Sequence, residues 1–580
     1  MKAIYQYMIG AAVLMGGFSS CSDFLEEQVP QGVLSDNQVS DPQYVDNVVI
    51  SAYAIFMTAE DINSSFSMWN FDVRSDDAYK GGNGTSDGDV FHQLEVEQGV
   101  LTTNWNISDM WVRLYNCISR SNIALALLEK CDNSYTLKEQ RIAEMRFLRA
   151  YGHFLLKRLY KYIPFVMDCN YTQDDYNNLS NRTYSNDEGW SQIINDLEYA
   201  YEVLPEQQKE VGRPSKAAAA AFLAKVYLYK AYRQDDATSH AITSINTDDL
   251  QKVIEYTDPA LYVGYGLESD LHDNFRPEPQ YENGKESIWA IQYSMNDGNT
   301  DGGNFNVSYG LITPNIPDVT DGGCDFYKPS QNLVNAYKVD NNGLPMFDTF
   351  NEKDYNLSVD YADQRLFLTV GIPGLPYAFN PSLMMEKSSV WSRSNGLYGY
   401  NVTLKQNVDP ASGYLFKGKT SEYWVSAQNR IVFRYADVLL ERAEAYAQLG
   451  QSTQAIALVN QIRERAKLSG DKGIIASYPH TYGVRMNVGT YTGSYDKEQT
   501  IRIVKMERRL EMGMECERFF DLVRWGDAAT VLNKYYVEEA DNCNIYSSAN
   551  FTANKNEYLP IPFSQIAASN GKYTQNIGNW

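Results

Sequence analysis

The spacing of apolar residues predicts a mainly helical chain. Over residues 434–449, apolar side chains recur every three or four positions, which places them on one face of an α-helix. Gly450 is a typical helix stop, and the same spacing resumes over residues 452–466. Two helices joined by a tight turn within about 34 residues match the length and shape of a tetratricopeptide repeat.

Other segments have the length and spacing of similar helices. They are residues 111–129, 138–160, 189–203 and 214–232. The last of these begins with a proline, a residue favoured in the first helical turn. Because a single repeat cannot bury its apolar face, three or more must stack on one another. We therefore expect about four helix pairs around one core, with a few short strands.

Long polar segments separate the predicted helices. They cover residues 76–89, 294–324, 374–420 and 469–494. These segments and their flanks hold much of the aromatic content, and aromatic residues make up 13% of the chain. Disordered segments are poor in aromatic residues. We therefore expect ordered loops that pack over the helices.

The first twenty residues have the features of a secretory signal. Lys2 is followed by an apolar run over residues 8–18, which is too short to span a bilayer. Two serines then precede Cys21, and this arrangement resembles a bacterial lipobox. We expect cleavage after residue 20 and attachment of a diacylglycerol to the Cys21 sulfur. An ordinary signal with an incidental cysteine stays open as the alternative.

Composition and motifs argue against several functions. The net charge of -23, without a basic cluster, argues against a nucleic-acid partner. The histidines are far apart and no motif of a zinc enzyme, an α/β-hydrolase or a dinucleotide site is present. We predict no enzyme activity, no bound metal and no cofactor. Structural Ca²⁺ at Asp297 with Asp301, or at the loop of Asp87 and Asp89, stays open, although neither segment follows the twelve-residue calcium-loop pattern.

Several short motifs occur in order along almost the whole chain. They are Trp111-x-x-Leu114-Tyr115, Glu144-Met-Arg146, Arg158-Leu-Tyr160, Gly212-Arg213-Pro214, Asn460-x-Ile-Arg463, Glu507-Arg-Arg509-x-Glu511, Arg518-Phe-Phe-Asp521 and Leu559-Pro560-Ile561-Pro562. Together they resemble the SusD/RagB family of outer-membrane nutrient-binding lipoproteins. The resemblance implies one mainly α SusD-like domain over residues 21–580, with an N-terminal part at about 22–232 and a C-terminal part at about 270–580. It also implies four tetratricopeptide-like repeats.

The resemblance further implies a function. Such a protein would be anchored by lipid on the outer membrane at the cell surface. It would capture oligosaccharides or polysaccharides with its loops and deliver them, without chemistry, to a SusC-like TonB-dependent transporter.

The charged residues of the motif helices have a structural explanation. Arg434, Asp437, Glu441 and Glu444 recur at intervals of three and four and can form a partly buried polar network between helices. For the same reason we do not assign Arg518, Asp521, Arg524 or Trp525 to a ligand site.

Candidate ligand residues are sought in the polar loops. Sugar recognition uses flat aromatic rings together with planar groups that bind paired hydroxyls. Trp105, which lies between two asparagines before the first motif helix, is the main candidate for a stacking ring. The other candidates are Asp61, Asn63, Arg74, Asp87, Cys324, Asp325, Trp391, Arg393 and Tyr398. Ordinary loop packing is the competing interpretation for each of them.

One clear loop tryptophan among acids and amides favours a furanose or branched sugar over a helical glucan. A fructan such as levan is the specific hypothesis, while pectin fragments and host glycans stay open. Two other classes also stay open. One is a secreted glycoside hydrolase with helical repeats, because spacing in sequence does not give the separation of two carboxylates. The other is a tetratricopeptide adaptor that binds peptides.

Overall fold

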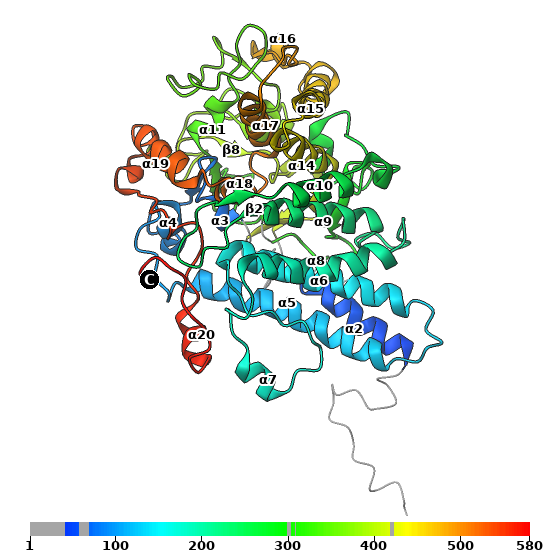
Figure 1. Cartoon of the computed structure of the whole chain (residues 1–580). Helices are drawn as coiled ribbons and strands as arrows, with labels where there is room; N and C mark the ends of the chain where they lie inside the picture. Colours follow the sequence, from blue (N-terminus) through cyan, green and yellow to red (C-terminus); the bar gives the residue numbers. More distant parts are fainter. Residues whose placement is uncertain (1–40, 57–68, 299–302, 308, 418–422) are drawn as a thin grey trace, which may run out of the picture.

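The computed structural model of the chain describes residues 41–56, 69–298, 303–307, 309–417 and 423–580. Within these ranges the fold is mainly helical, as predicted, with short two-stranded sheets between the helices (Figure 1). Five residues named above, Lys2, Cys21, Asp61, Asn63 and Asp301, lie outside the described residues.

A stack of long helices forms the scaffold. They are α2 (Pro42–Ala54), α5 (Trp105–Lys130), α6 (Lys138–Tyr160), α8 (Asn186–Val203), α9 (Lys216–Ala231), α10 (Thr247–Tyr256), α14 (Tyr435–Gln448), α15 (Ser452–Lys472) and α17 (Lys497–Met512). From α5 onwards each helix packs against the next, and α17 contacts both α14 and α15. This order of contacts confirms the tetratricopeptide-like arrangement.

Local capping explains where the predicted helix boundaries differ from the observed ones. Helix α5 begins six residues earlier than predicted, because the Asn104 side chain accepts hydrogen bonds from two backbone N–H groups of the first turn. Helix α9 begins later, because Ser215 is its cap and Pro214 therefore precedes the helix. Gly450 adopts φ 75°, the left-handed conformation expected of a residue that ends a helix.

Shorter helices lie between and after the long ones. They are α3 (Trp69–Asp72), α4 (Asp89–Glu95), α7 (Gln173–Asn178), α11 (Gln331–Ala336), α12 (Leu366–Thr369), α13 (Asn395–Tyr398), α16 (Tyr478–Tyr482), α18 (Arg518–Trp525), α19 (Ala528–Glu539) and α20 (Phe563–Ala568).

The strands of the described residues pair two by two. The pairs are β1 (Ala78–Gly81) with β5 (Phe326–Pro329), β2 (Tyr232–Arg233) with β3 (Ser244–Ile245), β4 (Ser287–Ile291) with β11 (Arg430–Arg434), β6 (Tyr361–Ala362) with β12 (Arg485–Met486), β7 (Val370–Gly371) with β8 (Val402–Thr403), and β9 (Leu415–Lys417) with β10 (Trp424–Ser426). All are antiparallel except β6 with β12.

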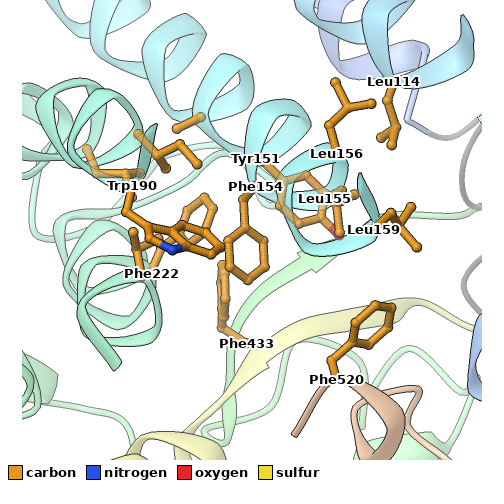
Figure 2. Packing of buried hydrophobic residues seen from close by; sticks show 14 of the residues in the cluster. Leu114, Tyr151, Phe154, Leu155, Leu156, Leu159, Trp190, Phe222, Phe433 and Phe520 are labelled. Carbon is orange, nitrogen blue, oxygen red and sulfur yellow. The ribbon is translucent and has the colours of Figure 1, made fainter. Parts of the chain in front are cut away.

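The main apolar core joins the helices to the β4–β11 sheet. Figure 2 shows Phe154 of α6, Phe222 of α9 and Phe433 of β11 grouped at its centre. The ring centroids of Phe154 and Phe222 lie 5.2 Å apart, and those of Phe222 and Phe433 lie 5.1 Å apart. Each ring contact at such a distance contributes about 0.5–1.5 kcal/mol to stability, beyond the contribution from burying the ring surfaces.

The predicted polar network is present and buried. Arg434 donates to Glu511 at 2.7 Å, and Glu444 accepts from Arg524 at 3.0 Å and from the Trp525 indole at 2.9 Å. The partners come from α17 and α18, so the network joins helices that are far apart in sequence. Because all these groups are buried and paired, they belong to the scaffold, as predicted for the motif residues.

The C-terminal segment packs against the end of α6. The backbone N–H of Leu559 donates to the Leu159 carbonyl at 2.8 Å, and the Asn576 side chain donates to the Tyr160 carbonyl at 2.8 Å. Carbonyl groups in the last turn of a helix have no partner within the helix. Residues 559–576 supply partners for two of those in α6.

Candidate functional site

An open groove lies between the start of α5 and α20. It has a volume of about 660 Å³. The residues that line it are Thr102, Thr103, Trp105, Ser108, Asp109, Val112, Arg113, Phe563 and Ser564. The α5 members recur at positions i, i+3, i+4, i+7 and i+8, so they share one helix face. We call this feature the groove.

Two aromatic side chains are exposed in the groove. Trp105 is 46% exposed and Phe563 is 60% exposed. The Trp105 ring is supported from inside by the buried Phe91 of α4, with ring centroids 5.9 Å apart and planes at 64°. Because Trp105 is the first residue of α5, the Asn104 cap fixes its backbone. The groove thus presents aromatic surface on both α5 and α20.

Polar groups line the same groove. The Arg113 Nε atom donates to the Asp109 carboxylate at 2.5 Å, one helical turn away, and these side chains are 23% and 32% exposed. Hydroxyl groups of the threonines and serines named above also line the groove, beside the apolar Val112. Such a surface can accept the apolar side of a sugar ring and form hydrogen bonds with its hydroxyls.

A glycine-rich loop, residues 81–88, closes around a side-chain cation. The Lys80 ammonium donates to the carbonyl oxygens of Gly81 at 2.9 Å, Gly84 at 2.9 Å and Asp87 at 2.6 Å. Lys80 is buried, and burial lowers the pKa of its ammonium while nearby Glu95 and Asp87 oppose that shift. This is the loop of Asp87 and Asp89, where structural Ca²⁺ was left open. Three of its carbonyl groups bind the Lys80 ammonium.

Aromatic rings flank this ammonium. Its nitrogen lies 5.1 Å from the ring centroid of Phe326 and 5.5 Å from that of Tyr398. A Cβ atom on Gly82 would lie 2.8 Å from the Phe326 ring, so glycine is required where the loop crosses β5. The loop is thus fixed by its cation and by the rings around it.

Arg393 contacts two segments that are distant in sequence, the glycine-rich loop and residues 324–325. Its guanidinium lies 3.2 Å from the Asp87 carboxylate and donates to the Cys324 carbonyl at 3.2 Å. The Arg393 backbone N–H donates to Asp325 at 3.0 Å. The structure therefore brings these four predicted residues together. We call residues 81–88, 322–325 and 391–398 the loop face.

The predicted residues of the loop face differ in exposure. The side chains of Asp87 and Arg393 are 33% and 30% exposed. Cys324 is half-buried, and burial raises the pKa of its thiol to about 11. The other three, Asp325, Trp391 and Tyr398, are buried.

Each of the three buried residues has a partner inside the protein. Asp325 pairs with Lys328 at 2.7 Å, Trp391 packs against Tyr377 with ring centroids 5.7 Å apart, and the Tyr398 hydroxyl donates to Glu95 at 3.4 Å. Their side chains face the interior, so they stabilise the loop face through contacts inside the protein. Ordinary loop packing describes their contacts.

Arg74 lies apart from both features. It is buried, and its Nε atom donates to Glu97 at 2.6 Å while its Nη2 atom donates to the Asn556 carbonyl. The guanidinium also lies 4.1 Å from the centre of the Phe519 ring. Arg74 thus connects three segments of the interior, and the structure does not bring it to the groove or the loop face.

The groove and the loop face share one aromatic support. Phe91 contacts Trp105 of the groove and also Phe326, whose ring centroid lies 6.3 Å away. Phe326 in turn flanks the Lys80 ammonium beneath the loop face. The two features are therefore neighbours. Sequence reasoning missed Phe563, since it is far from Trp105 in the chain and belongs to a short helix without periodicity.

Comparison with known families shows which family the chain belongs to. The model of the SusD family matches residues 285–580, and a second model, described as starch-binding associating with outer membrane, matches residues 23–228. The chain belongs to the SusD family.

Curated SusD relatives match over most of their length. SusD-like protein P38 of Formosa agariphila is 28% identical over 429 residues, which is 73% of each chain. SusD-like protein P2 of the same organism is 24% identical over 587 residues and covers 99% of each chain.

Solved structures show the same SusD fold. A SusD homologue from Bacteroides thetaiotaomicron has a TM-score of 0.71 at 16% identity and covers 94% of this chain and 99% of its own. A laminarin-binding SusD-like protein has a TM-score of 0.66 at 21% identity, with coverage of 92% and 99%. Surface glycan-binding protein A from B. thetaiotaomicron, in complex with laminarihexaose, has a TM-score of 0.62 at 19% identity, with coverage of 92% and 99%.

Two observations on this SusD chain concern the membrane and metals. In the part of the chain that the structure describes, every helix is too short or too polar to cross a bilayer. The same residues contain no group of three or more His, Cys, Asp or Glu side chains arranged to hold a metal ion.

Proposed function

We propose that this SusD family chain is a cell-surface lipoprotein that captures glycan in the groove and on the loop face. It does not cleave the glycan, and it delivers it to a SusC-like TonB-dependent transporter. The observation that carries the proposal is the pair of exposed rings, Trp105 and Phe563, in an open groove that is otherwise lined by hydroxyls, one ion pair and Val112.

The roles of the groove residues follow from their chemistry. Trp105 and Phe563 offer apolar ring faces to the C–H surface of sugar rings. The Asp109–Arg113 pair and, next to it, the Asp87–Arg393 pair offer planar groups that bind neighbouring hydroxyls. Binding of this kind needs neither a metal nor a cofactor.

The similar proteins support a glycan as the ligand. Two of the solved SusD-like structures are described as binding laminarin or laminarihexaose. For this chain we propose a fructan such as levan as the first substrate to test, with laminarin beside it. Attachment through a lipid on Cys21 would keep the groove at the cell surface, beside the transporter.

Affinity electrophoresis of the mature protein tests the proposal. We expect levan or laminarin in the gel to retard the protein, without release of reducing sugar during incubation. Trp105→Ala should lose most of the retardation, since it removes one of the two exposed rings. Val537→Ala is the matched control, because Val537 is 78% exposed on α19 and does not line the groove.

Two results would contradict the proposal. Release of reducing sugar by the wild-type protein would indicate a glycoside hydrolase. Equal retardation of Trp105→Ala and wild type would show that the groove does not bind the glycan. The anchor is tested separately, since Cys21→Ala should abolish incorporation of labelled fatty acid and release the protein from the membrane fraction.

A further inference from the structure

The arginines of the groove and the loop face already have carboxylate partners. Arg113 is the only cation among the described residues that line the groove, and it pairs with Asp109 at 2.5 Å. Arg393 is the only cation within the three segments of the loop face, and it pairs with Asp87 at 3.2 Å. Both features therefore carry no excess of positive charge.

The carboxylates are held in place by the fold. Asp109 precedes Arg113 by one turn of the same helix, so the two groups stay adjacent. Asp87 accepts a hydrogen bond from the backbone N–H of Asn83 at 2.8 Å, within the loop that closes around Lys80. The Asp87 carboxylate therefore cannot turn away from Arg393 without losing its hydrogen bond to the Asn83 backbone.

This arrangement opposes the binding of an acidic polysaccharide. A chain of uronic acids or sulfated sugars would meet Asp87 and Asp109 on a protein whose net charge is -23, while Arg393 and Arg113 are already paired. The exposed ammonium of Lys417 lies only at the edge of the loop face, where it donates to the Asp321 carbonyl at 3.4 Å. A neutral sugar meets no such repulsion. It can use the remaining acceptor sites of the carboxylates and the remaining donors of the guanidinium groups.

We propose that the groove and the loop face select neutral glycans, and that Asp87 and Asp109 are the residues that determine this selectivity by neutralising Arg393 and Arg113. The proposal rests on the proposed function, glycan capture at the same site. It adds the chemical class of the ligand and names two residues that set it.

The experiment compares neutral and acidic polysaccharides in affinity gels and by titration calorimetry. The neutral probes are levan, laminarin and mannan, and the acidic probes are polygalacturonate and chondroitin sulfate. We expect wild type to bind at least one neutral probe, with an affinity that NaCl does not change, and neither acidic probe.

The double variant Asp87→Asn/Asp109→Asn tests the two residues directly. It leaves both arginines without a charged partner, so it should bind polygalacturonate at least about tenfold more tightly than wild type at low salt. NaCl should remove this gain, because exposed charges are screened. The single variants should each show part of the gain, which keeps the test valid if the double variant folds poorly.

Asp348→Asn is the matched control. Asp348 is 79% exposed and pairs with Arg502 away from both features, so its substitution changes the net charge and unpairs an arginine elsewhere. It should leave polygalacturonate binding at the wild-type level.

The outcomes separate this inference from the proposed function. Wild type that binds polygalacturonate or chondroitin sulfate as well as a neutral probe overturns the inference but leaves glycan capture intact. A double variant without any gain overturns the role of Asp87 and Asp109. Wild type that binds none of the five probes overturns glycan capture itself.

Discussion

The helical scaffold and the groove use the same pairs of charged residues for different purposes. In the scaffold, buried Glu444 accepts hydrogen bonds from Arg524, Trp525 and Tyr232, so the protein itself occupies its oxygens. In the groove, Asp109 contacts Arg113 while both side chains remain partly exposed. Arginine and carboxylate in a helix motif thus indicate scaffold when buried, and a possible ligand contact only when they reach an open surface.

The largest effect is expected from breaking the scaffold network. Burial alone raises the pKa of Glu444, but Arg524 lowers it to about 2, so the carboxylate is charged in the folded protein at neutral pH. Glu444→Ala leaves Arg524 buried without this partner and should cost about 3–5 kcal/mol of unfolding free energy. Urea unfolding measures this loss. The folded fraction should keep its glycan affinity, and a cost below about 1 kcal/mol would contradict the structural role.

Lys80 shares a property with each region. It is buried, like the scaffold residues, and it binds three carbonyl groups of the loop face. Lys80→Met leaves three carbonyl groups without their donor, so stability should fall by about 2 kcal/mol or more. Glycan affinity should also fall, because Asp87 loses its fixed position.

Lys405→Met is the control for the Lys80 variant. Lys405 is also buried, and it donates to the Glu511 carbonyl at 3.0 Å and to Glu515 at 2.6 Å within the scaffold. It should lose stability but keep glycan affinity. If both variants bind glycan alike, the loop does not depend on its internal cation.

Asp72 is a buried carboxylate for which the described residues provide no ion pair. It differs in this from Glu444, which pairs with Arg524. Its oxygen accepts from the Tyr327 hydroxyl at 2.5 Å. Burial, together with nearby Asp77, raises the pKa of Asp72 to about 7. A raised carboxyl pKa stabilises the folded state at low pH, and this contribution is lost as pH rises from the unfolded value of about 4 through 7.

The Asp72 contribution should fall by about 1.4 kcal/mol between pH 6 and pH 8. Asp72→Asn should remove this part of the slope. Unfolding free energies at the two pH values, measured for both proteins, provide the check. Parallel slopes for wild type and variant would show that Asp72 titrates normally.

The smallest effect is expected from Phe563. Because its side chain is 60% exposed, Phe563→Ala should change the unfolding free energy by less than about 0.5 kcal/mol. Loss of one ring face should weaken glycan binding by about 0.5–1.5 kcal/mol. Calorimetric titration with the best neutral probe measures this change. A variant with wild-type affinity would show that α20 does not contribute to binding in the groove.

The scaffold could be predicted from sequence because its signals are local. Apolar spacing identified residues 434–449 and 138–160, and Gly450 marked a turn. The motif charges were assigned correctly to a buried network. Side-chain capping, as at Asn104, explains the errors at helix starts.

The candidate site could be predicted only in part. Composition pointed to Asp87, Cys324, Asp325 and Arg393, but only the packing of distant segments shows that they meet. Exposure was not predictable for Trp391 and Tyr398, since an aromatic residue in a polar loop fits either a surface or a small core. Phe563 gave no signal, because its importance depends on the opposite wall of the groove.

The contacts between residues 559–576 and the end of α6 have a consequence for the order of folding. During synthesis, α6 is made long before the residues that bind its last carbonyl groups. These two carbonyl groups of α6 therefore lack their protein partners until almost the whole polypeptide has been made. A chain interrupted before residue 559 would keep an unfinished helix terminus and would be a preferred target for proteases.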